Sequence, residues 1–205
     1  IAARLGYIFI DTGAMYRAMA LYFLREKIDP KDEKAIAAAC PKIDITIAYQ
    51  EGTQCVILNG ENVNDYIRDE EVGIMASNTS IYADVRAKLT ALQQKLAQTS
   101  NVIMDGRDIG TCVLPNAQVK IYLTAKVSAR AARRYEELVK KGVEADYDQI
   151  ETDIKDRDYR DMHREIAPLK QADDAILVDS SDMDIEQVLS AIKKIYEKAV
   201  LKGKE

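Results

Sequence analysis

The sequence predicts an α/β fold in which a parallel sheet is sandwiched by helices and carries a small antiparallel insert. Short apolar runs recur along the chain, and each precedes a turn and a helical pattern, as in parallel α/β sheets. Over residues 43–66 this hydrophobic pattern changes to alternating apolar and polar residues, which favours antiparallel strands. The length of 205 residues fits one domain of ordinary size.

The individual elements follow from the hydrophobic periodicity. Apolar runs predict strands of the parallel sheet at residues 7–10, 102–104, 119–123 and 175–178. Apolar residues at helical spacing predict helices at 14–26, 82–98, 127–140 and 185–199. In the insert, Asn59-Gly60 is a strong hairpin signal. A densely charged stretch, 147–164, places Arg157, Arg160 and Arg164 at helical offsets on one face.

Composition predicts a soluble globular protein of the cytoplasm. Hydrophobic residues make up 47% and charged residues 31% of the chain, which is too apolar for a disordered protein. No apolar run approaches the roughly 20 residues that cross a bilayer, and the first residues lack the order of a secretory signal. We therefore expect no membrane partner.

Charge and rare residues exclude several classes of function. With 29 basic and 34 acidic residues the net charge is −5, which argues against a broad surface for nucleic acid. Three separated cysteines predict neither a disulfide framework nor a zinc site. A single histidine, His163, argues against metal hydrolases and Ser-His-Asp hydrolases. Any polyanionic ligand must meet a local basic cluster.

The first candidate motif spans residues 11–17, where a strand ends and a helix begins. Free backbone N–H groups and the helix dipole make such a position suitable for an anion. Arg17 adds a planar fork that matches two oxygens of a phosphate. Thr12 near the helix start also fits the simpler interpretation, which is plain helix capping.

The second motif is Asp105-Gly106-Arg107-Asp108, at the carboxyl end of a predicted strand. Ligands of open α/β sheets bind at such ends, and Gly106 permits a tight turn. The alternative is a charged surface turn that contains an Arg–Asp pair.

The third motif is a concentration of arginine between residues 130 and 164. It comprises Arg157, Arg160 and Arg164 and, on the preceding helix, Arg130, Arg133 and Arg134. Arginine is favoured over lysine where phosphates are gripped. The alternative is a set of weak surface Arg–Asp pairs.

Taken in order, these motifs resemble bacterial cytidylate kinases over nearly the whole chain. The matching segments read IDTGAMYR at 10–17, DGRDIGT at 105–111, RDYRD at 157–161 and APL at 167–169. The resemblance implies a P-loop-type fold with a five-stranded parallel sheet, a mobile monophosphate-binding region and a mobile helical lid. It implies a single kinase domain whose core comprises 1–40, 78–145 and 165–205, with a monophosphate-binding insert at 41–77 and the lid at 146–164.

The resemblance also implies roles for individual residues. By it, the acceptor phosphate is held by Arg17, Arg107, Arg157 and Arg164, of which the last three are expected to be catalytic. Cytosine is expected to face Ser77, Arg86 and Asp108. Asp161 matches a ribose contact, Thr12 a substrate-side hydroxyl, and Arg130 and Arg134 the arginines that bind ATP. No residue is expected to be a metal ligand.

The chain differs from these kinases in one large respect. Kinases of this class open with a strand and a G-x-x-x-x-G-K-[ST] loop that cradles the ATP phosphates. No such sequence occurs in the chain, and residues 1–6 resemble the end of the helix that follows the loop. We expect roughly 20 further residues before Ile1 in the natural protein, the size of a strand-loop-helix unit, and expect activity only with them.

The expected reaction is transfer of the γ-phosphoryl group of ATP, with Mg²⁺, to CMP and dCMP by a monomer. Another monophosphate kinase, such as one acting on UMP, is the nearest alternative. A nucleotide-binding protein without catalysis is the alternative from a different class, favoured if the P-loop is truly absent.

Overall fold

The protein is described by a computed structural model that covers residues 1–50 and 53–202. The chain divides into two compact units. We call Ala2–Ile109 the N-terminal unit and Gly110–Glu205, with which Ile1 groups, the C-terminal unit. Each unit is described by itself below.

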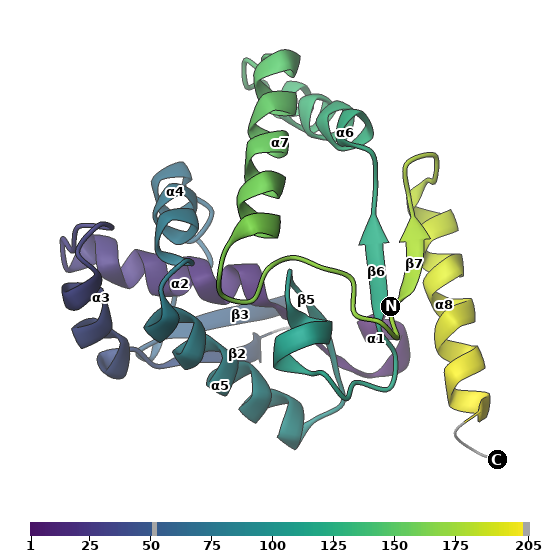
Figure 1. Ribbon diagram of the computed structural model, residues 1–205, viewed down its shortest axis with the longest axis horizontal. Coiled ribbons are helices and arrows are strands. Elements are labelled where there is room, and N and C mark those ends of the chain that lie inside the picture. The colour runs from purple at the N-terminus through teal and green to yellow at the C-terminus, as the bar shows by residue number, and fades with distance from the viewer. Residues whose placement is uncertain (51–52, 203–205) are drawn as a thin grey trace. The chain divides into compact units, whose positions relative to one another are not determined.

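The N-terminal unit combines a parallel strand pair, an antiparallel sheet and helices (Figure 1). Its helices are α1 (Ala2–Leu5), α2 (Thr12–Arg25), α3 (Glu33–Ala39), the 3₁₀ turn η1 (Cys40–Lys42), α4 (Glu70–Thr79) and α5 (Ala83–Thr99). Its strands are β1 (Ile8–Asp11), β2 (Ile45–Gln50), β3 (Thr53–Leu58), β4 (Glu61–Asn62) and β5 (Val102–Asp105).

Strands β1 and β5 pair in parallel, in a register that aligns Ile8 with Val102 and Asp11 with Asp105. Because parallel strands end at the same edge, the residues that follow Asp11 and Asp105 begin side by side. This register brings together the first two motifs, which are about 90 residues apart in the sequence.

The core of the N-terminal unit forms around α2. Met15, Met19 and Phe23 lie one helical turn apart and are fully buried. Burial of side chains of this size stabilises a fold by about 1.5–3 kcal/mol each. Ile45 and Leu58 of the antiparallel sheet join the same cluster, so the insert packs on α2.

The antiparallel insert has the predicted hairpin order β2-β3-β4. Asn59 and Gly60 connect β3 to β4 with φ of 48° and 89°, a conformation that these two residue types adopt most easily. Ile45 is buried whereas Asp44 and Thr46 are exposed, as the alternation predicts.

The C-terminal unit contains a second parallel pair, formed by β6 (Ile121–Thr124) and β7 (Ile176–Asp179). Its helices are α6 (Val127–Lys140), α7 (Tyr147–His163) and α8 (Ile185–Lys202), and the π-helical turn η2 (Ile109–Val113) begins at the boundary of the units. Helices α6 and α7 pack against one another within this unit (Figure 1).

The α/β class, the parallel pairing and the antiparallel insert are confirmed. Helices 82–98, 127–140 and 185–199 begin and end within three residues of α5, α6 and α8. In the described ranges, the parallel strands form two separate pairs, β1-β5 and β6-β7, where the resemblance implies one sheet of five strands. The division into core, monophosphate-binding insert and lid stays a prediction.

None of the helices in the described part of the chain has the length and apolar character needed to span a bilayer.

Candidate functional site

Asp11 organises the start of α2. It is the last residue of β1, and its Oδ1 accepts a hydrogen bond of 3.0 Å from the N–H of Ala14, so it caps the helix. Its other oxygen, Oδ2, lies 3.5 Å from Nη2 of Arg17. Capping and the placement of an arginine beside the helix start therefore occur together, and the two interpretations of this motif are compatible.

Thr12 links this helix start to the end of β5. Its side chain is buried, and its hydroxyl donates a 2.6 Å hydrogen bond to the carbonyl of Asp105. A Cβ at Gly106 would lie inside van der Waals contact with the Thr12 hydroxyl and 2.9 Å from Cδ1 of Ile109. Only glycine permits this close approach. The two motifs are thus fixed against each other.

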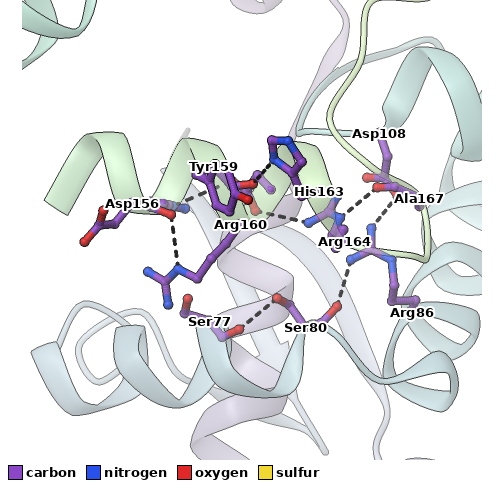
Figure 2. A network of polar contacts seen from close by, with 12 residues as sticks. Ser77, Ser80, Arg86, Asp108, Asp156, Tyr159, Arg160, His163, Arg164 and Ala167 are labelled. Carbon is purple, nitrogen blue, oxygen red and sulfur yellow. Dashed lines mark hydrogen bonds and ion pairs between the residues drawn. The ribbon is translucent and has the colours of Figure 1, made fainter. Parts of the chain in front are cut away.

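The three residues expected to face cytosine lie in one hydrogen-bonded network, shown in Figure 2. Asp108 Oδ2 accepts a 2.6 Å bond from Nη2 of Arg86, and both side chains are less than a tenth exposed. Nη1 of Arg86 donates to the carbonyl of Ser80 at 2.9 Å, and the Ser80 hydroxyl donates to the carbonyl of Ser77 at 3.0 Å. The ring of Tyr16 lies 5.6 Å from the Arg86 guanidinium carbon, within cation–π range.

This network joins three separate segments of the N-terminal unit. Ser77 belongs to α4, Arg86 to α5 and Asp108 to the turn after β5. A carboxylate has about four lone-pair sites, and the bond from Arg86 uses one of those of Asp108. Removal of one partner of such a buried pair leaves an uncompensated charge.

Arg107 lies between Gly106 and the buried Asp108, and its side chain is exposed. The turn after β5 therefore directs Asp108 inward and Arg107 toward solvent.

In the C-terminal unit, Asp161 brings two predicted arginines together. Its Oδ1 lies 3.2 Å from Nη1 of Arg164, and its Oδ2 lies 3.9 Å from Nε of Arg157. Arg164 is 9% exposed and also donates from Nε to the carbonyl of Ala167 at 2.8 Å (Figure 2). Arg160 of the same helix donates from Nε to the carbonyl of Asp156 instead. Of the three arginines predicted to share a face, Arg157 of α7 and Arg164, which caps its end, converge on one carboxylate.

Arg130 on α6 is held by a carboxylate of α7. Its Nη1 donates to Asp158 Oδ1 at 3.1 Å, its Nη2 donates to Asp158 Oδ2, and its Nε donates to the carbonyl of Ala125 at 3.1 Å. The hydrogen bonds to Asp158 raise the pKa of the Arg130 guanidinium above its usual value, against the opposing effect of burial.

The other two arginines of α6 have different partners. Arg134 pairs with Glu137 at 3.0 Å on an exposed face. Nη2 of Arg133 donates to the carbonyls of Ser180 at 2.5 Å and Met183 at 3.2 Å, in the loop after β7. Arg133 therefore stabilises this loop.

Three residues that take part in these contacts were not predicted from the sequence. Arg68 lies 3.5 Å from Asp11, Asp158 binds Arg130, and the Ser80 carbonyl holds Arg86. Asp158 lies inside the RDYRD segment, so its place among arginines was a usable signal. Arg68 and Ser80 belong to none of the motifs.

Within residues 1–50 and 53–202, no three His, Cys, Asp or Glu side chains gather in a way that could hold a metal ion.

The comparisons with known proteins agree on one family. The chain matches the family model described as cytidylate kinase over residues 1–198. It is 50% identical over 200 residues to a cytidylate kinase of Caldicellulosiruptor bescii, a match that covers 98% of this chain and 88% of the relative. It is 46% identical over 198 residues to a cytidylate kinase of Lactobacillus johnsonii, a match that covers 97% of this chain and 86% of the relative. It is 45% identical over 204 residues to a cytidylate kinase of Bacillus licheniformis, a match that covers 98% of this chain and 90% of the relative. The chain belongs to the cytidylate kinase family.

Proposed function

We propose that the protein is a phosphotransferase that moves the γ-phosphoryl group of ATP to CMP and dCMP, giving ADP and the corresponding diphosphate. The network of Ser77 with the buried pair Arg86 and Asp108 carries the proposal for the acceptor, because it offers polar groups suited to a cytosine. The protein acts in the cytoplasm, where both nucleotides are available. It acts as a monomer, since every expected contact comes from one chain.

The network accounts for a preference for cytosine. Asp108 accepts from the exocyclic amine, while Arg86 and Ser77 donate to N3 and O2. Uracil presents a carbonyl in place of that amine. A carboxylate opposite a carbonyl leaves an acceptor unpaired, which costs about 1–3 kcal/mol. This difference is large enough to separate CMP from UMP.

Arginines supply the charge that phosphoryl transfer requires. Arg17 and Arg107 bind the acceptor phosphate, and Arg157 and Arg164 neutralise charge during transfer, since catalysis here is mostly positioning and electrostatic stabilisation. Arg107, Arg157 and Arg164 are thus the proposed catalytic residues. Asp161, which lies between the last two, also binds the ribose.

The contacts of the helix start and of the donor side complete the proposal. The Thr12 hydroxyl, held by the Asp105 carbonyl, lies on the substrate side. Arg130 and Arg134 bind the phosphates of ATP. Mg²⁺ enters as its complex with ATP, because this ion usually keeps several waters and relies on substrate phosphates.

The test is an ADP-release assay with CMP, dCMP, UMP, AMP and GMP as acceptors. We expect CMP and dCMP to be phosphorylated with a kcat/KM at least about tenfold above that for UMP, the ratio that corresponds to about 1.4 kcal/mol. A preference for UMP would contradict the role of Asp108. Tight CMP binding without turnover, in a protein that carries the expected P-loop, would instead identify a nucleotide-binding protein.

A substitution makes this test specific. Asp108→Asn replaces one acceptor oxygen with an amide that can donate to uracil, so we expect the CMP to UMP ratio to fall by about tenfold. The matched control is Glu61→Gln, which also removes a carboxylate paired with an arginine, Arg25, outside the network. The control should keep the ratio of the unaltered protein.

A further inference from the structure

We infer that Arg68 is an additional ligand of the acceptor phosphate, acting beside Arg17. The ligand class is the dianionic phosphate monoester of a nucleoside monophosphate. The inference rests on the proposed function, which supplies the monophosphate, and it assigns a role to a residue that lies in none of the sequence motifs.

The fold fixes the backbone of Arg68 while leaving its side chain accessible. Arg68 precedes α4 in a turn where Ile67 donates to the carbonyl of Val63 at 3.1 Å and Asp69 donates to the carbonyl of Tyr66 at 3.2 Å. The side chain of Ile67 is 2% exposed and belongs to the core. The side chain of Arg68 is 67% exposed. The turn therefore presents a guanidinium group from an anchored position.

Two guanidinium groups meet at one carboxylate oxygen. Nη2 of Arg68 and Nη2 of Arg17 each lie 3.5 Å from Oδ2 of Asp11, although Arg68 is 57 residues distant from Asp11 in the sequence. The other oxygen of Asp11 caps α2. The start of α2 adds a partial positive charge beside the two guanidinium groups.

The geometry of these contacts differs from that of a structural ion pair in the same unit. Arg25 and Glu61 form two hydrogen bonds, of 2.5 and 2.9 Å. Nη2 of Arg17 and Nη2 of Arg68 each lie farther from Asp11, at 3.5 Å, whereas charge-assisted bonds usually measure about 2.7–2.9 Å. A phosphate has three outer oxygens, so it can bind both guanidinium groups at the shorter distance.

Gly13 places no side chain beside these groups. A Cβ at Gly13 would lie 3.1 Å from Oδ1 of Asp11 and 3.7 Å from Nη1 of Arg17. A side chain at this position would therefore crowd the carboxylate and the guanidinium from which a phosphate has to be reached. The two guanidinium groups, the positive end of α2 and the lack of a side chain at Gly13 together favour a phosphate at this place.

The experiment compares the affinities of CMP and cytidine, which differ only in the phosphate. Calorimetric titrations are carried out on the unaltered protein, on Arg68→Gln and on Arg68→Lys. We expect Arg68→Gln to lower the affinity for CMP by at least about tenfold and to leave that for cytidine unchanged. Arg68→Lys should recover part of the loss, because it restores the charge and not the fork.

Arg25→Gln is the matched control, since it also removes an exposed guanidinium that pairs with a carboxylate of the N-terminal unit. It should leave both affinities unchanged. An unchanged ratio of CMP to cytidine affinity in Arg68→Gln, or an equal loss for both ligands, overturns the inference. Failure of the proposed function has a different signature: CMP binds with an affinity that depends on Arg68 but is not phosphorylated, even by a protein that carries the expected P-loop.

Discussion

At the scale of single residues, the arginines of this protein are oriented by acidic partners. Arg17 lies beside Asp11, Arg130 beside Asp158 and Arg164 beside Asp161. A guanidinium group loses water as it becomes buried, so a partly buried arginine requires a counter-charge and filled hydrogen-bond sites. The acidic partners meet that requirement and also aim the planar forks. An acidic chain can therefore hold local phosphate sites.

Substitutions of Arg157 and Arg164 test the proposed catalytic role of these arginines separately from their effect on stability. We expect Arg157→Ala and Arg164→Ala each to lower kcat/KM for CMP by at least about tenfold, since a hydrogen bond to a charged group is worth about 1.5–3 kcal/mol. Arg157 is 63% exposed and Arg164 only 9%. Only Arg164→Ala should also lower the melting temperature.

Lys155→Ala is the control for these two variants, because it removes a positive charge from the same helix that pairs at i and i+4, with Glu151 at 3.1 Å. Steady-state kinetics and a thermal melt on all three proteins provide the measurement. Kinetics of Arg157→Ala equal to those of the control would remove that arginine from the reaction.

Contacts between charged side chains could be predicted from the sequence only where the residues belong to one local motif. Arg157 and Arg164 lie seven residues apart at the end of the charged stretch, so helical periodicity predicts one face for both, although Arg164 is the residue that caps the end of α7. The contact between Arg68 and Asp11 joins residues 57 positions apart. It depends on the packing of the insert against α2, which no spacing rule encodes.

At the scale of elements, the predicted strands end one residue too early. Predicted strands 7–10, 102–104 and 175–178 end before Asp11, Asp105 and Asp179, and each of these residues is the last of its strand. An apolar run ends where charge begins, but the backbone ladder continues for one more residue, as the pairing of Asp11 with Asp105 demonstrates. Helix α2 likewise begins at Thr12, because Asp11 is its cap.

The turn after α7 offers a test of local strain. Ala167 has φ of 50°, in the left-handed region, while its carbonyl accepts from Arg164 and the N–H of Leu169 donates to the carbonyl of Asp161 at 2.7 Å. A Cβ costs about 1–2 kcal/mol in this conformation. Glycine avoids that cost but has more freedom in the unfolded chain, by about 0.4–1 kcal/mol.

We therefore expect Ala167→Gly to stabilise the protein by about 0.5–1 kcal/mol, which raises the melting temperature by about 1–4 °C at this length. Ala172→Gly is the control, since Ala172 is not among the described residues with positive φ. It should leave the melting temperature unchanged or lower it. A lower melting temperature for Ala167→Gly would show that no strain is stored at this turn.

At the scale of the whole molecule, the residues expected to bind substrate are divided between the two compact units. The expected base contacts, Ser77, Arg86 and Asp108, all belong to the N-terminal unit. Asp161 and the arginines of α6 and α7 belong to the C-terminal unit. Because the expected base contacts belong to one unit, binding of the base can be measured without phosphoryl transfer. The measurement is the rise in stability of the folded protein when the nucleotide is added.

A ligand that binds only the folded state stabilises it by about 2.7 kcal/mol when present at 100 times its Kd. For a chain of this length each kcal/mol raises the melting temperature by about 2–4 °C, so CMP at that concentration should raise it by about 5–10 °C. UMP at the same concentration should give a smaller rise, because in the proposed site its carbonyl would face the carboxylate of Asp108. In Asp108→Asn the two nucleotides should become nearly equivalent, while Glu61→Gln should keep the difference. Equal shifts by CMP and UMP in the unaltered protein would contradict a cytosine site at Asp108 whatever the catalytic rate, since the melt depends on binding alone.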